Sequence, residues 1–308
     1  MGIDDPIHGY YTKKPQDRFS RLKREIDTGL RTLDTSGELP FLRSLLDALE
    51  IPVSSQMLVY SVTSLQKNLI SPRRPRALYF NDDTYVAWVQ DSDTFEVVAI
   101  DPQHGPRFYT VHNTPPARPT VERETVKCLA CHDSAGMRPG GVPRVLVKSA
   151  PVEAQMNPAG RMTPADISQA TPLELRWGGW YVTGSLGTQL HLGNLPLPGA
   201  PDPVVRGIHN RSNLDSLAPH FDTSPYPTPR SDIVAFLVLE HQSHVQNFLT
   251  RAHADLRTVV KGDEAWDGLD EARRAKLRDL LEPLAQAMTF QDEQPLFGRI
   301  RGGSGFDR

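Results

Sequence analysis

The stretch Cys128-Leu129-Ala130-Cys131-His132 separates a β-rich first part of the chain from a second part that ends in long helical segments. Its two cysteines are the only ones among 308 residues. On one helical turn, side chains three and four residues apart share a face, so both thiols and the imidazole can meet one ligand. C-x-x-C-H is the pattern of covalent haem attachment, in which the thiols bond the porphyrin and the histidine ligates the iron.

Two other kinds of site also use a C-x-x-C spacing. A structural zinc site needs four ligands, usually from a second C-x-x-C or an H-x-x-x-H pair, and the chain has neither. A thioredoxin-like dithiol expects a preceding buried parallel strand, which residues 121–127 do not predict. We therefore expect one covalently bound haem c, since there is no second C-x-x-C-H.

The pentapeptide is similar to the haem-binding motif of c-type cytochromes. Three longer runs resemble an uncharacterised family of bacterial monohaem proteins: Trp177-Gly-Gly-Trp-Tyr-Val-Thr-Gly184, His191-Leu-Gly-Asn194 and Leu239-Glu-His-Gln242. Those relatives often carry Met directly after the histidine of the second run, where this chain has Leu192, which cannot ligate iron. The resemblance implies a single haem and no known reaction.

Composition limits the expected partners and location. The chain has 34 basic and 37 acidic residues, so it presents no strong electrostatic attraction for nucleic acid or an anionic membrane. No run approaches the roughly eighteen apolar residues of a membrane span. Because bacterial haem c is attached outside the cytoplasm, we expect an exported, periplasmic protein whose signal peptide is missing from the given sequence. Redox proteins are the expected partners.

The flanking sequence predicts an α+β fold. Apolar spacings of three and four predict amphipathic helices over 16–33 and 39–49. Short β-branched and aromatic runs separated by turn residues predict an antiparallel meander with strands at 57–63, 77–81, 84–90, 94–101 and 107–112. A strand at 142–147, a hairpin pairing 176–184 with 188–193, and helices over 231–261 and 269–290 are expected in the second part.

These elements suggest two domains and a tail. Residues 1–119 are expected to form the N-terminal helices and the meander, 120–300 a haem domain closed by the C-terminal helices, and 301–308 a flexible tail. Between predicted strands, the run Ser71-Pro-Arg-Arg-Pro-Arg76 can bind carboxylates of haem or of an acidic partner, or can be a solvated loop.

The group opposite His132 on the iron separates an electron carrier from a catalyst, because a filled site leaves no place for substrate. We rank His191, in the predicted aromatic hairpin, slightly above His241, which lies within the apolar stripe of the long helix. An open position ranks third. A buried histidine is more often a core residue, and Met137, Met156 and Met162 are weaker candidates.

Aromatic and basic side chains near His191 complete the predicted site. Trp177 and Trp180 are expected to line the haem pocket, and Arg176 is expected to contact a propionate. Electron transfer is the expected function. The alternatives are a peroxidase-like haem c oxidoreductase with an open or displaceable distal position, and a haem-free binding module built on the meander.

Overall fold

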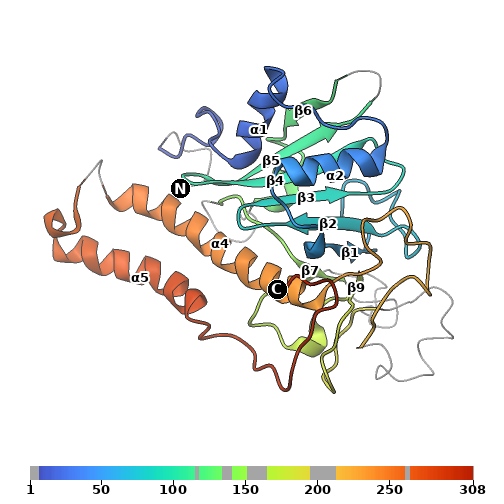
Figure 1. Cartoon of the computed structure of the whole chain (residues 1–308). Coiled ribbons are helices and arrows are strands. Elements are labelled where there is room, and N and C mark those ends of the chain that lie inside the picture. Colours follow the sequence, from blue (N-terminus) through green and yellow to red (C-terminus); the bar gives the residue numbers. More distant parts are fainter. Residues whose placement is uncertain are drawn as a thin grey trace.

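The computed structural model describes residues 7–114, 118–133, 141–150, 165–194, 213–260 and 264–307. It confirms the predicted α+β class: two N-terminal helices, an antiparallel sheet and two long C-terminal helices follow one another along the chain (Figure 1). No helix in these ranges is both long and apolar enough to cross a membrane.

One seven-stranded sheet forms the centre of the molecule. Its strands are all antiparallel to their neighbours and stand in the order β6-β5-β4-β3-β2-β1-β9. Their bounds are β1 Met57–Val59, β2 Arg76–Phe80, β3 Thr84–Trp88, β4 Thr94–Asp101, β5 Gly105–His112, β6 Thr120–Arg123 and β9 Trp180–Tyr181. Each of the five predicted meander runs therefore overlaps a strand. A separate pair joins β7 Lys148–Ser149 to β8 Ala165–Asp166.

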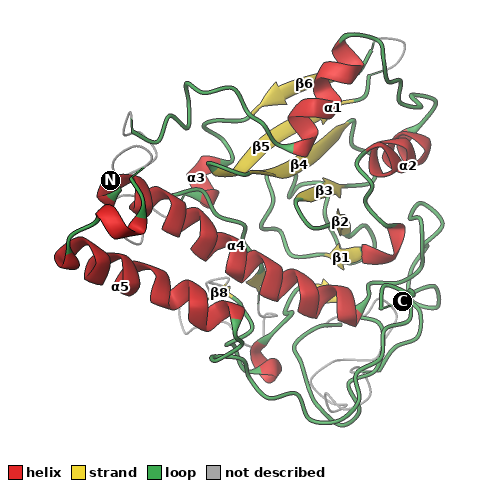
Figure 2. Ribbon diagram, turned by 60° about the vertical axis from the view of Figure 1, so that its left-hand side comes forward, coloured by secondary structure: helices red, strands yellow, loops and turns green. Residues whose placement is uncertain are grey.

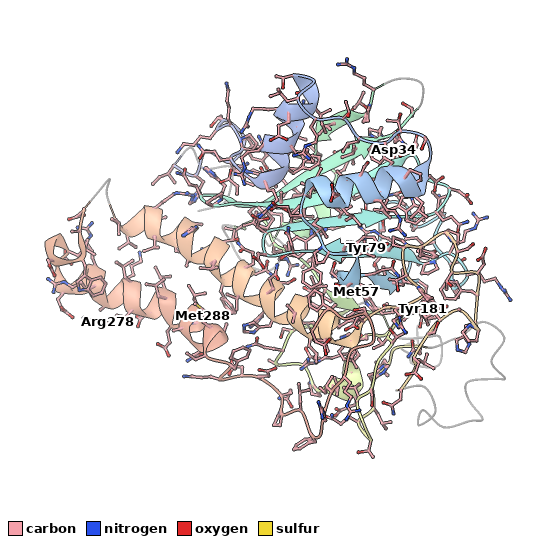
Figure 3. The ribbon with its side chains drawn as sticks, viewed as in Figure 1. Asp34, Met57, Tyr79, Tyr181, Arg278 and Met288 are labelled. Atoms are coloured by element: carbon pink, nitrogen blue, oxygen red, sulfur yellow. The ribbon has the colours of Figure 1, made fainter. Side chains whose placement is uncertain are left out.

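The first face of the sheet is covered by α1 Arg18–Asp27 and α2 Glu38–Ala48 (Figure 1). Both helices bury residues at spacings of three and four, such as Phe19 with Leu22 and Leu42 with Leu45. The strands supply every second residue to the same core, including Tyr79, which is fully buried in the sheet (Figure 3). Alternation in the strands and helical spacing in the helices thus account for this layer.

The second face of the sheet is crossed by α4 Ile233–Val259, and α5 Glu271–Met288 lies beside α4 on the outer side (Figure 2). Near its start, α4 buries Phe236 against Trp177 and Trp180. Near its end, Ala254 joins a smaller cluster with the short helix α3 Leu129–His132. The described part of the chain also contains the 3-10 turns Val53–Ser55, Leu173–Leu175 and Trp266–Gly268.

The predicted hairpin over 176–193 does not form. Its first strand, β9, pairs with β1 instead, placing Tyr181 opposite Leu58. The side-chain amide of Asn194 accepts from Val182 N at 2.7 Å and donates to Val182 O at 2.9 Å, so it satisfies backbone groups that a second strand would have paired. The predicted strand at 142–147 is likewise not a strand; β7 begins at Lys148.

The C-terminal segment returns to the start of α4. The Asp232 carboxylate caps α4 by accepting from Val234 N at 2.8 Å, and it also accepts from Gly303 N and Ser304 N at 2.8 Å each. Arg301 N donates to Ser185 O at 3.0 Å. The predicted flexible tail at 301–308 is therefore hydrogen-bonded over its first residues, and the sheet takes strands from both sides of the predicted boundary at 119.

We predict that Asp232→Ala lowers the free energy of unfolding by about 2 to 3 kcal/mol, because it leaves N–H groups of both α4 and the tail without an acceptor. Urea denaturation measures this loss. Asp270→Ala is the matched control: Asp270 caps α5 through Arg273 N alone, at 2.8 Å, and its loss should cost about 1 kcal/mol. Equal losses for the two variants would mean that the tail contacts contribute nothing.

Candidate functional site

The C-x-x-C-H pentapeptide forms one helical turn. His132 N donates to Cys128 O at 2.9 Å, and Ala130 N donates to Val126 O at 3.0 Å. Cys128 is half-buried and Cys131 exposed, and the two thiols are not joined to each other. In the described ranges, no three His, Cys, Asp or Glu side chains are grouped so as to hold a metal ion.

His132 is held by a reciprocal pair of hydrogen bonds with Arg144. Arg144 N donates to His132 O at 2.8 Å, and the His132 ring lies with Nδ1 3.0 Å from Arg144 O. A carbonyl oxygen only accepts, so Nδ1 carries the proton and Nε2 has a free lone pair. None of the described residues hydrogen-bonds Nε2. Metal-ligating histidines are usually oriented by such a backbone carbonyl.

Burial also favours the neutral imidazole. It lowers the pKa of His132 below the usual value for histidine, and the hydrogen bond to Arg144 O only partly opposes this effect. The neutral ring is the form that binds a metal. The ring packs on Phe108 of β5, with centroids 4.8 Å apart. Its neighbour Leu129 is buried in the same apolar cluster.

The sheet beneath α3 carries one apolar and one polar cross-strand pair. Val98 of β4 lies opposite Phe108 of β5, and both belong to the apolar cluster that includes Cys128. Two residues along the same face, Glu96 lies opposite Thr110. The apolar pair therefore supports His132, and the polar pair lies next to it.

The polar pair connects to both sides of the site. Thr110 Oγ1 donates to Glu124 Oε1 at 3.2 Å, and Glu124 lies four residues before Cys128 in the chain. On the other side, Glu96 forms an ion pair with Arg76 of β2. Burial, with Glu124 and Glu96 nearby, raises the pKa of Cys128 to about 12. A thiol of that pKa is protonated at neutral pH, whereas redox-active and nucleophilic cysteines need a lowered pKa.

The outer side of α3 is exposed. Val126 is 76% exposed, and Ala130 and Cys131 are exposed beside it. Two hollows among the described residues, of about 220 and 10 Å³, are not lined by the pentapeptide. Val126 and Ala130 lie on the side of the turn opposite Cys128 and His132, so a macrocycle bonded to both sulfurs would lie on the face that Cys128, Cys131 and His132 share. Free thiols at the required spacing and an oriented neutral histidine are consistent with that group.

Arg176 and Trp177 occupy a different place from the one predicted. Arg176 donates to Glu240 Oε2 at 2.8 Å, Gln169 O at 2.7 Å and Thr171 O at 2.7 Å, and its side chain is almost completely buried. Trp177 Nε1 donates to the other Glu240 oxygen at 2.6 Å. Arg176 is thus the counter-ion of Glu240 in the core around α4, and the expectation that it binds a propionate is corrected.

Trp180 and His191 also pack in this core. Trp180 Nε1 donates to Lys148 O at 2.7 Å. His191 is 2% exposed; its ring lies 5.1 Å from that of Trp177, and its Nδ1 accepts from Gly193 N at 2.9 Å. These contacts are those of a core histidine, and a ligand role for His191 stays a prediction.

His241 contacts residues from two other segments of the chain. Its ring stacks on Phe290 with centroids 4.1 Å apart, and its Nδ1 pairs with the side chain of Gln169. A ligand role for His241 stays a prediction. Met137, Met156 and Met162 lie outside the described residues.

Sequence reasoning missed most of the side chains that surround α3. Arg144, Phe108, Glu96 and Glu124 reach it through the tertiary fold, and no local motif marks them. Of the residues near α3, only Arg76 had been marked by the sequence, as the last residue of the basic run 71–76.

Comparison of the chain with protein-family models, with curated proteins and with solved structures found no match in any of the three.

Burial raises the pKa of Glu240 to about 7, although Arg176 opposes this. A carboxyl with a raised folded pKa contributes stability below its unfolded value, near 4.5, and loses that stability as the pH rises through about 7. Glu240→Gln is neutral at every pH and should lack this loss. We predict that the free energy of unfolding of the wild type, relative to the variant, falls by on the order of 2 kcal/mol between about pH 5 and about pH 8.

Urea titrations at both pH values measure the difference. Glu271→Gln is the control, because that carboxylate is 72% exposed and should give no such trend. A relative stability that rises with pH would contradict the prediction and show that the attraction of Arg176 outweighs burial.

Proposed function

We propose that this protein is a c-type cytochrome that carries one haem, bonded through Cys128 and Cys131 and ligated by His132, and that it acts in electron transfer. The observation that carries the proposal is the contact between His132 Nδ1 and Arg144 O at 3.0 Å. It leaves Nε2 as the only ring nitrogen that can ligate iron, directly beside two free thiols.

The haem would supply one-electron redox chemistry when bound. The chain's own residues have separate tasks. Arg144 O keeps the proton on Nδ1, and Phe108 packs on the ring and limits its rotation. Leu129 and Val98 exclude water from beneath the turn. A low-dielectric surrounding of this kind is one of the means by which a protein sets a reduction potential.

Electron transfer is favoured by the exposure of α3. Cys131 is exposed, so the edge of a macrocycle bonded to it would lie at the surface and be accessible to a redox partner protein. Attachment of haem c outside the cytoplasm makes the protein an exported one in this proposal. Commitment of both cysteines to thioethers would also suit an oxidising compartment.

Expression with a bacterial haem-attachment system tests the proposal directly. We expect one haem per chain that stays with the polypeptide after denaturation, and a pyridine spectrum of two saturated vinyl groups. Cys131→Ala should leave one thioether, and Cys128→Ala combined with Cys131→Ala should leave none. His132→Ala should lose the native iron spectrum, whereas His253→Ala, an exposed histidine of α4, should keep it. Wild-type protein without covalent haem would refute the proposal.

The same preparation separates a carrier from an enzyme. A carrier with both axial positions filled should give low-spin spectra that cyanide leaves unchanged in the ferric state and carbon monoxide in the ferrous state. Stopped-flow mixing measures both. Rapid binding of either ligand would contradict electron transfer with a filled site and support the peroxidase-like alternative.

A further inference from the structure

Arg76 is a basic side chain with an unsatisfied donor on the sheet face beneath α3. Its Nη2 pairs with Glu96, and the two side chains are only 21% and 17% exposed. Its Nε is buried, and none of the described residues accepts a hydrogen bond from it. A buried donor without an acceptor costs about 1 to 3 kcal/mol, so an acceptor at this position would stabilise the protein.

A chain of contacts places this pair beside the pentapeptide. Glu96 lies opposite Thr110, which donates to Glu124, four residues before Cys128 in the chain. Val98, on the same face as Glu96, packs in the cluster that contains Cys128. Because Arg76 pairs with Glu96, two residues along the strand from Val98, it lies next to this cluster.

We propose that Arg76 is a positioning residue that donates from Nε to a carboxylate of the haem and, together with Glu96, sets the reduction potential of the iron. The inference rests on the proposed function. A guanidinium is suited to a carboxylate because its planar donors form charge-assisted hydrogen bonds. Haem presents two propionate carboxylates. Arg176, the residue first expected to bind one, already forms an ion pair with Glu240.

The two members of the pair should act on the potential with opposite signs. A cation near the iron opposes the additional positive charge of the ferric state, so Arg76→Gln should lower the potential. An anion favours the ferric state, so Glu96→Gln should raise it. Net charge and hydrogen bonding near a redox centre are established determinants of its potential. Loss of two residues with a purely structural role is not expected to shift the reduction potential in opposite directions.

Spectroelectrochemical titration of the purified haem protein measures both shifts. We expect Arg76→Gln to reduce the ratio of ferrous to ferric protein at a fixed applied potential about tenfold, equivalent to about 59 mV for a one-electron couple. Arg76→Lys, which keeps the charge, should restore most of the difference. Arg74→Gln is the matched control: it removes the same charge from the same run and breaks an ion pair with Asp91, but it is 48% exposed and should leave the ratio unchanged.

Each outcome is decisive. If wild-type protein carries no covalent haem, the proposed function and this inference both fall. If haem is attached but Arg76→Gln gives the same ratio as Arg74→Gln, the inference alone is overturned. If Arg76→Gln does not retain haem, the other two variants test the inference. A raised potential in Glu96→Gln, together with a near-native potential in Arg76→Lys, supports it. An unchanged potential in Glu96→Gln overturns it.

Discussion

The reciprocal hydrogen bonds between His132 and Arg144 are the contact on which the site depends. They bring the chain beyond residue 140 back to the turn of α3 and fix one tautomer of the imidazole. The next residue, Val145, is held through both backbone groups by the side chain of Asn247 on α4, at 2.8 Å each. The orientation of His132 is therefore set by the C-terminal helix as well as by its own turn.

The two faces of the sheet have different physical roles. The face under α1 and α2 is mainly apolar, with a few buried polar contacts such as that from Tyr109 Oη to Asp17, so its main contribution is to stability. The face under α3 and α4 mixes Val98 and Phe108 with Glu96 and Arg76, and β4 alternates half-buried with buried residues. Polar groups in a partly covered layer cost free energy unless they are paired. An ion pair that is maintained there, next to free thiols, is more consistent with a site than with packing alone.

Local patterns predicted local structure well. Asp232 and the apolar spacing that follows it indicated α4, and strand alternation indicated β2 to β5. The spacing of the pentapeptide predicted the three central residues of the candidate site, and their role stays a proposal. The errors all concern partners that are distant in sequence. The bonding of Asn194 to Val182 replaced the expected hairpin, and Glu240 took the guanidinium that had been assigned to a propionate.

The pairing of β1 with β9 also affects the order in which the molecule can assemble. Leu58 and Tyr181 are far apart in the chain, so the sheet acquires its last strand only after the pentapeptide and the segment beyond it have been made. Until then, β1 is an open edge with unsatisfied backbone groups, the kind of surface that recruits strands from other molecules. Non-local pairing of this kind slows folding. A chain truncated before Trp180 would therefore keep an aggregation-prone edge.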